Sequence, residues 1–183
     1  MDIISNNPLI IKKNFKEIFS DLSEDMINHL LKFRRLKYNF QIGNNKNFNL
    51  LYDTFLNFIK SSFKNYTIKN LEYKYWGCLI DKYFAINSWH NHLTTSTING
   101  VFYLDIDEEN ENGLAFKINN EIKIHKPKLY DMIVFPNFLE HKPLIPKKLN
   151  KMRISINTEV FCTETATDIF NLNNLKIKEK YEE

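Results

Sequence analysis

The second half of this chain is a succession of short aromatic and β-branched segments separated by turn residues, a pattern compatible with few folds. The expected strands are 73–80, 83–92, 98–106, 114–118, 121–126, 131–136 and 152–161. The first two flank a turn at Asp81-Lys82, and we expect them to pair antiparallel. Short strands joined by hairpin-length connections predict a mainly β fold, either a sandwich or a barrel.

The helices are expected before the strands. Residues 22–34 and 49–63 carry apolar side chains at helical spacing, and a possible edge strand at 8–11 precedes them. The second helix has one apolar stripe, formed by Leu50, Leu51, Phe55, Phe58, Ile59 and Phe63. A stripe of this kind packs on a core, so we expect it to cover a sheet. A short helix is also expected at 168–172.

The chain has 183 residues, enough for one domain with a real core. We predict a single domain, with a mostly helical buttress (1–70), a β core (71–162) and a polar tail (163–183). The net charge of +3 comes from interspersed charges, which does not indicate nucleic-acid binding. Cys78 and Cys162 cannot form a disulfide framework, and no signal peptide or membrane span is evident. We therefore expect a soluble, cytoplasmic protein; its oligomeric state is not predicted.

Three histidines are placed to bind one metal ion. His90 and His92 are two residues apart, and side chains at this spacing share a face of an extended segment. His141 follows 49 residues later, directly after the expected strand 131–136. Oxygen-activating iron is commonly held by two histidines and a carboxylate that leave open coordination positions. A close pair and a distant histidine suit such a site at the mouth of a barrel.

Arg153 is the second unusual residue, because it lies in an otherwise apolar strand, MRISI. Its planar guanidinium can grip a carboxylate with two hydrogen bonds. Ser155 lies on the same face of that strand, and Tyr103 lies on the strand after the histidine pair. We therefore expect a carboxylate-binding site beside the metal.

In these motifs the sequence resembles the Fe(II)/2-oxoglutarate-dependent oxygenases, especially a small bacterial and phage branch. The matching segments are HNH at 90–92, INGVFYL at 98–104, FPNFLEH at 135–141 and RISIN at 153–157. Their order and spacing carry the resemblance, which covers about residues 76–161. It implies a double-stranded β-helix, or jelly roll, with N-terminal helices behind its larger sheet.

The resemblance also implies roles for individual residues. His90, His92 and His141 would bind Fe(II), and Arg153, with Ser155 and Tyr103, would bind the far carboxylate of 2-oxoglutarate. His92 departs from the family, which usually has Asp or Glu there, so Asp105 or Asp107 is an alternative third ligand. The implied reaction is hydroxylation coupled to oxidative decarboxylation of the keto-acid, with no catalytic residue beyond the metal site.

The substrate is expected to be a small molecule or a side chain of another molecule. Asn87, Trp89 and Phe138 flank the metal-binding positions and would line the substrate cavity, although core packing explains them equally well. Two other functions stay open. One is a cupin-like, three-histidine dioxygenase that needs no keto-acid, and the other is a jelly-roll binding or structural protein without activity.

Overall fold

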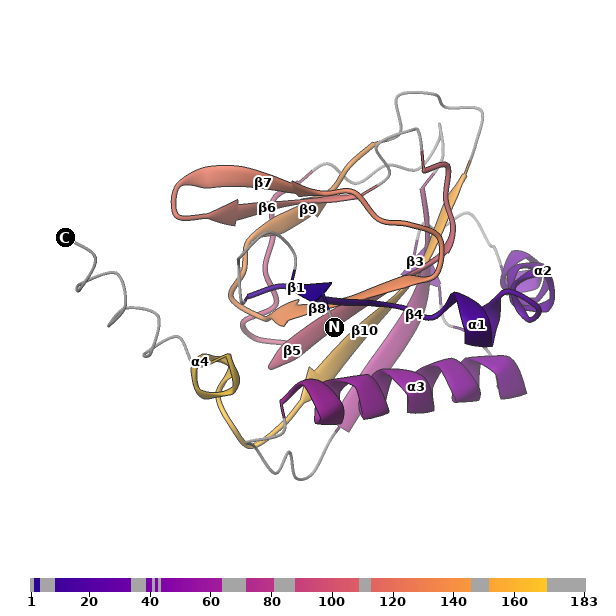
Figure 1. Ribbon diagram of the computed structural model, residues 1–183, viewed down its shortest axis with the longest axis horizontal. Helices are drawn as coiled ribbons and strands as arrows, with labels where there is room; N and C mark the ends of the chain where they lie inside the picture. The colour runs from indigo at the N-terminus through magenta and orange to yellow at the C-terminus, as the bar shows by residue number, and fades with distance from the viewer. Residues whose placement is uncertain are drawn as a thin grey trace.

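Two antiparallel sheets, with helices on the outer face of the larger one, form the protein in a computed structural model (Figure 1). The structure describes residues 2–3, 9–33, 39–40, 42, 44–63, 72–80, 88–108, 113–145 and 152–170. Every strand pairing among these residues is antiparallel. This confirms the mainly β architecture expected from the second half of the chain.

The larger sheet has the strand order β1-β2-β8-β5-β10-β4-β3. Its strands are β1 Asp2–Ile3, β2 Ile11–Asn14, β3 Asn39–Phe40, β4 Glu72–Ile80, β5 Ile98–Asp105, β8 Asp131–Pro136 and β10 Arg153–Phe161. The smaller sheet has the order β7-β6-β9, with β6 Leu114–Ile118, β7 Glu121–His125 and β9 His141–Pro143. Strand β10 pairs with β4 on one side and β5 on the other, so its side chains lie at the centre of the larger sheet.

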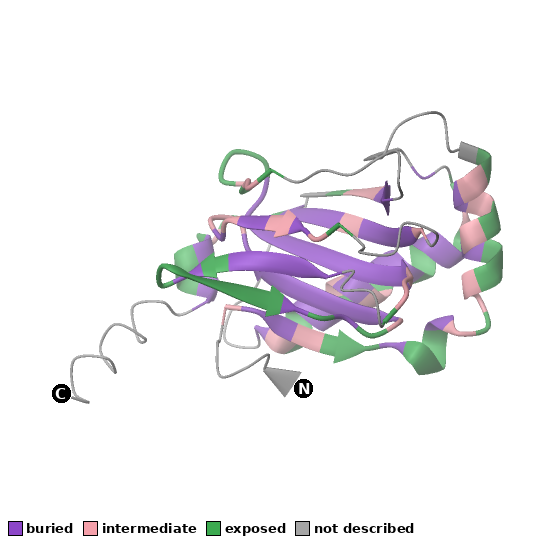
Figure 2. Ribbon diagram, turned by 90° about the horizontal axis from the view of Figure 1, so that it is seen from above, coloured by how far each residue is buried: buried purple, intermediate pink, exposed green. Residues whose placement is uncertain are grey.

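The two faces of the larger sheet pack into two apolar clusters. On β5, Phe102 and Leu104 pack with the helices, whereas Val101 and Tyr103 pack with the smaller sheet. Every residue from Ile98 to Leu104 is therefore buried. A strand covered on both faces reads as a continuous apolar run rather than an alternation. Figure 2 shows the strands in the middle of the molecule as buried along most of their length.

The helices are α1 Lys16–Phe19, α2 Ser23–Phe33, α3 Lys46–Ser62 and α4 Ala166–Ile169. Helix α3 begins after Asn45, whose side chain accepts a hydrogen bond from the amide of Asn47 at 2.8 Å. The predicted stripe of α3 faces the sheet, except that Leu50 is 41% exposed. None of the described helices is long and apolar enough to cross a membrane.

Gly100 on β5 allows α3 to lie close to the sheet. A Cβ atom at this position would lie only 2.0 Å from Cε2 of Phe55. The ring of Phe55 therefore occupies the space above Gly100, and any larger residue at 100 would displace it.

Most predicted elements are confirmed, with local differences. Helix α2 matches the expected helix 22–34, α4 begins before the expected 168–172, and β2 begins where the expected strand 8–11 ends. Residues 81–87, with the predicted turn and half of the predicted strand 83–92, lie outside the described residues. The remainder, 88–92, pairs only through an isolated bridge at His90. Between the expected strands 131–136 and 152–161 the structure contains a further short strand, β9, that was not predicted from the sequence.

A two-residue turn joins β6 and β7. Asn119 and Asn120 both have positive φ angles, 51° and 62°, as a type I′ hairpin requires. The turn fixes a register in which Leu114 lies opposite His125. This brings His125 to the interior end of β7, whereas the rest of that strand is exposed.

Candidate metal and cosubstrate site

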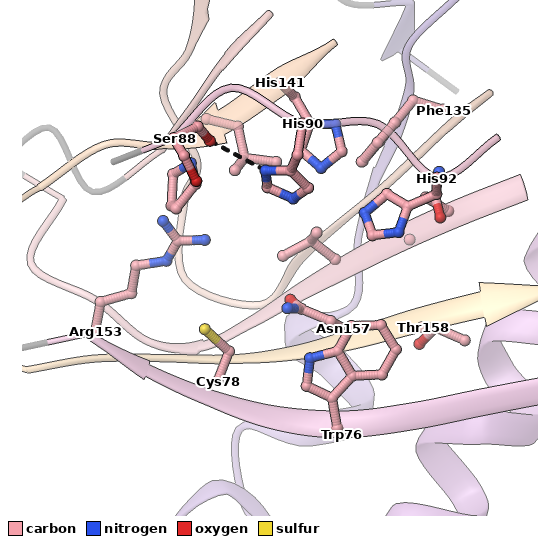
Figure 3. A pocket seen from close by; sticks show the side chains of 15 residues that line it. Trp76, Cys78, Ser88, His90, His92, Phe135, His141, Arg153, Asn157 and Thr158 are labelled. Atoms are coloured by element: carbon pink, nitrogen blue, oxygen red, sulfur yellow. Dashed lines mark hydrogen bonds between the residues drawn. The ribbon is translucent and has the colours of Figure 1, made fainter. Parts of the chain in front are cut away.

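A cavity of about 310 Å³ opens between the two sheets and contains the predicted metal ligands together with Arg153 (Figure 3). Its wall comes from β4, β5 and β10, from the segment 88–92, and from the short strand β9. None of the described residues that line it is acidic. The cavity is thus lined by imidazoles, one guanidinium, amides, two hydroxyl groups, one thiol and apolar side chains.

The backbone brings the three histidines together. His90 and His141 form an isolated antiparallel bridge, and the amide of His92 donates to the carbonyl of Asn137 at 2.8 Å. One ligand nitrogen from each histidine lies within 4.8 Å of the other two. The segment 88–92 therefore lies against the turn that follows β8, so a separation of 49 residues in sequence becomes direct contact.

The Nδ1 atoms of all three histidines lie near oxygen atoms. His90 Nδ1 is 3.1 Å from the carbonyl oxygen of Ser88, and His141 Nδ1 is 2.9 Å from that of Leu139. Carbonyl oxygens only accept hydrogen bonds, so these two Nδ1 atoms carry the proton and leave the Nε2 lone pairs free for a metal. Burial lowers the pKa of His141 to about 3, which keeps this imidazole in its neutral, metal-binding form.

His92 differs from the other two, because its Nδ1 faces a carboxylate. Oε1 of Glu159 lies 2.6 Å from this nitrogen and also accepts a hydrogen bond from the hydroxyl of Thr95 at 3.0 Å. Burial opposes ionisation of Glu159, but the hydrogen bonds from His92 and Thr95 lower the pKa of its carboxyl overall. The residues that flank the metal-binding positions thus include a carboxylate that the motif analysis missed. Glu159 is an even number of positions from Arg153 and Ser155 on the same strand, which could have indicated that all three face the cavity side.

Arg153 is 2% exposed and projects into the cavity (Figure 3). Its Nη1 donates to the carbonyl of Gly113 at 2.9 Å, and its guanidinium lies 5.2 Å from the ring centroid of Tyr103. The buried atoms Arg153 Nε, Ser155 Oγ and Tyr103 Oη have no hydrogen-bond partner among the described residues. Unpaired buried polar groups are costly, so this set fits a bound carboxylate that would pair with them.

His125 is a further buried polar residue that sequence reasoning missed. Its ring lies 5.8 Å from that of Tyr103, and its Nε2 has no hydrogen-bond partner in the part of the chain that the structure describes. Burial, together with the charges of Lys12 and Arg153, lowers its pKa to about 3. A neutral imidazole therefore lies beside the predicted carboxylate site. The hairpin register at 119–120 could have indicated this placement.

The cavity also holds unpaired hydrogen-bond donors away from Arg153. Nε1 of Trp76 and Nδ2 of Asn99 are buried without hydrogen-bond partners among the residues that the structure describes, and both residues line the cavity. Cys78, on β4, lies between Trp76 and Arg153 in the cavity wall (Figure 3). Burial raises the pKa of its thiol. A protonated, buried thiol is chemically inert, so we give Cys78 no role beyond lining the wall.

Of the three predicted substrate residues, the structure describes Trp89 and Phe138. Asn87 is outside the described residues, and neither Trp89 nor Phe138 is among the described residues that line the cavity. Ser88, His90 and His92 face inward, so Trp89 faces outward in this extended segment. Its ring instead lies under the ammonium groups of Lys117 and Lys142, at 4.8 and 5.1 Å.

The structure also separates the alternative carboxylate ligands from the histidines. Asp105 lies opposite Ile154, at the Arg153 end of β10, whereas His92 contacts Glu159 near the other end. Five residues of strand span about 17 Å. The cluster suited to metal binding among the described residues consists of the three histidines alone, and contains neither Asp105 nor Asp107.

No protein-family model matches the sequence, and no curated protein sequence matches it. Solved structures do resemble it. A prolyl-4-hydroxylase from Pseudomonas putida has a TM-score of 0.65 and 10% identity, over 84% of this chain and 92% of its own. The 2OG complex of a viral collagen prolyl hydroxylase from Paramecium bursaria Chlorella virus-1 has a TM-score of 0.57 and 13% identity, over 88% and 100%.

A third similar structure is a prolyl hydroxylase from Trichoplax adhaerens in complex with a peptide fragment of the hypoxia inducible factor oxygen degradation domain. It has a TM-score of 0.60 and 13% identity, over 91% of this chain and 88% of its own. These identities are low, so the likeness concerns the fold. The protein has the fold of the prolyl hydroxylases, with a three-histidine cluster compatible with the HxH and distal-histidine pattern of its sequence.

Proposed function

We propose that the protein is an Fe(II)- and 2-oxoglutarate-dependent oxygenase of the hydroxylase type, built as a jelly roll. The observation that carries the proposal is one cavity with three imidazoles and a buried arginine whose neighbours lack partners. The imidazoles suit a divalent transition metal, and the arginine suits a carboxylate. The viral neighbour solved with 2OG supports this combination.

In this proposal each residue binds or orients. His90, His92 and His141 would hold the metal through Nε2, and their Nδ1 contacts would fix the ring orientations. Arg153 would pair with the far carboxylate of the keto-acid, and Ser155 and Tyr103 would donate to the same group. Bound iron would couple oxidative decarboxylation of the keto-acid to hydroxylation of the substrate.

The remaining part of the cavity would receive the substrate. Trp76 and Asn99 offer unpaired N–H donors there, which would suit a hydrogen-bond acceptor such as a carbonyl oxygen. A small molecule or an amino-acid side chain would both fit, and the Trichoplax neighbour solved with a peptide supports the side chain. We further propose one domain, with residues 1–70 as the helical buttress, 71–162 as the core and 163–183 as a tail.

A three-histidine dioxygenase without a keto-acid is the second candidate, since it also explains the imidazole cluster. It would leave the buried polar atoms of Arg153, Ser155 and Tyr103 unpaired, so we rank it lower. A non-catalytic binding protein would leave them unpaired as well.

An anaerobic titration distinguishes these candidates. Protein loaded with Fe(II) should develop a visible charge-transfer band when 2-oxoglutarate is added, because the keto-acid chelates the iron. Metal binding without this band would favour the keto-acid-independent dioxygenase. Failure to bind Fe(II) or Mn(II) would favour the non-catalytic protein.

A further inference from the structure

Glu159 lies directly behind one of the three metal-binding histidines. Its Oε1 is 2.6 Å from His92 Nδ1 and 3.0 Å from Thr95 Oγ1, and the residue is 7% exposed. It belongs to β10, where it lies opposite Asn99 on β5. Strand β10 thus holds this carboxylate on the same face as Arg153, three side chains further along the alternation.

The contact fixes which nitrogen of His92 can bind a metal. An ionised carboxylate only accepts hydrogen bonds, so Nδ1 of His92 must carry the proton and Nε2 must be the free lone pair. The hydroxyl of Thr95 donates to the same carboxylate oxygen at 3.0 Å and lies 3.3 Å from Nδ1 of His92, so it helps to hold the carboxylate against the ring. His90 and His141 receive the same kind of orientation, but from neutral carbonyl oxygens.

Charge makes the contact of His92 different from the other two. Three neutral imidazoles leave both positive charges of a divalent ion uncompensated, and none of the described residues lining the cavity is acidic. In a poorly solvated site such an imbalance lowers metal affinity. Glu159 places one negative charge beside Nδ1 of His92, on the opposite side of the ring from the metal-binding Nε2.

We propose that Glu159 is a positioning residue of the metal centre, which orients His92 and supplies the negative charge that its three-imidazole ligand set lacks. The inference rests on the proposed metal site and names a residue beyond the ligands. Carboxylates hydrogen-bonded to ligating histidines typically change metal affinity by about 10 to 100-fold.

The test is calorimetric titration of metal-free protein with Mn(II) at one fixed pH. Glu159→Gln preserves the shape of the side chain and removes its charge, so the Kd should rise by about tenfold or more. Thr95→Val should raise it less, because the carboxylate stays but loses one anchor. Glu140→Gln is the matched control: Glu140 precedes His141, but it is 44% exposed and pairs with Lys117, so the Kd should stay at the parent value.

Testing Glu159→Gln a second time, in protein that already carries His92→Asp, separates the proposed role from a merely structural one. In His92→Asp protein there is no imidazole to orient, so adding Glu159→Gln should not weaken Mn(II) binding and should relieve repulsion between two carboxylates. The apo forms are compared by thermal unfolding. A lower melting temperature of Glu159→Gln with an unchanged Kd would overturn the proposal.

Two other outcomes count against it. If His92→Ala binds Mn(II) like the parent while Glu159→Ala does not, then Glu159 is itself the ligand. If the Kd rises equally when Glu159→Gln is added to the parent and to His92→Asp protein, the effect does not act through His92. If the parent protein binds no metal, the proposed metal site fails first, which is a different result from a parent that binds and a Glu159→Gln variant that binds equally well.

Discussion

The amide of His90 donates to the carbonyl of His141 at 3.0 Å, and the amide of His141 donates back to the carbonyl of His90 at 2.9 Å. This reciprocal pair holds the two residues side by side, with ring centroids 4.4 Å apart. The bridge is made by the main chain alone. The placement of His90 beside His141 is therefore set by the backbone, whereas the Nδ1 contacts orient the rings.

Removing one imidazole should therefore abolish metal binding without unfolding the protein. His90→Ala should lose stoichiometric Mn(II) binding and keep a parent-like circular dichroism spectrum, because the bridge to His141 needs no side chain. His141→Ala should lose Mn(II) as well, but also unfold more readily, since His141 is buried against Phe135. His29→Ala, on α2, is the control and should bind normally; parent-like affinity in His90→Ala would remove His90 from the site.

His125 should make the stability of the metal-free protein depend on pH. Burial lowers its pKa from 6.5 to about 3, so below pH 6.5 the unfolded chain takes up a proton that the folded protein does not. The free energy of unfolding should then be insensitive to His125 above pH 7. As pH falls from 6.5 toward 3 it should decrease, by at most about 1.4 kcal/mol per pH unit for this group.

Urea unfolding of the parent and of His125→Gln at pH 7 and pH 5 measures this contribution. The loss of stability between the two pH values should be smaller in the variant by about 1 to 2 kcal/mol. His141 has a lowered pKa too, so the variant should still lose some stability. Equal losses in parent and variant would show that His125 is not a buried neutral group.

The contact between Gly100 and Phe55 can be tested by asking whether a smaller residue at 55 restores the stability that a larger residue at 100 removes. Gly100→Ala should destabilise the protein by about 1 to 3 kcal/mol, because the new Cβ would collide with the ring of Phe55. Gly100→Ala combined with Phe55→Leu should lose less than the sum of the two single changes, measured by urea unfolding. Strict additivity would mean that α3 does not lie against β5 at this point.

The sequence predicted the strands well because turns such as Asn119-Asn120 and apolar runs are local signals. It also predicted that His90, His92 and His141 would meet and that Arg153 would be buried. Glu159 was missed: strand alternation places it on the face of Arg153, but its contact with His92 depends on the segment 88–92 folding back onto β10, which no local pattern encodes.

Trp89 is the opposite case: the sequence suggested a role in the site that its position in the structure does not support. Its proximity to the histidines in sequence suggested a place in the cavity, yet the alternation of an extended segment turns it outward, under Lys117 and Lys142. Which face of such a segment is inward follows from the bridge of His90 to His141, a contact between distant parts of the chain. The alternation of side chains along this segment was predictable from the sequence. Which of its two faces lies inward was not.

In the proposed function, the cavity binds a keto-acid whose second carboxylate pairs with Arg153. The most direct measurement compares 2-oxoglutarate with pyruvate, which lacks the far carboxylate, as ligands of Mn(II)-loaded parent and Arg153→Ala protein. The parent should prefer 2-oxoglutarate at least tenfold, since losing one partner of a buried charged pair costs about 2 to 5 kcal/mol. Arg153→Ala should bind Mn(II) normally and show little preference, and Arg153→Lys should recover part of it. A parent that binds the two keto-acids equally, or a preference that survives in Arg153→Ala, would contradict the account.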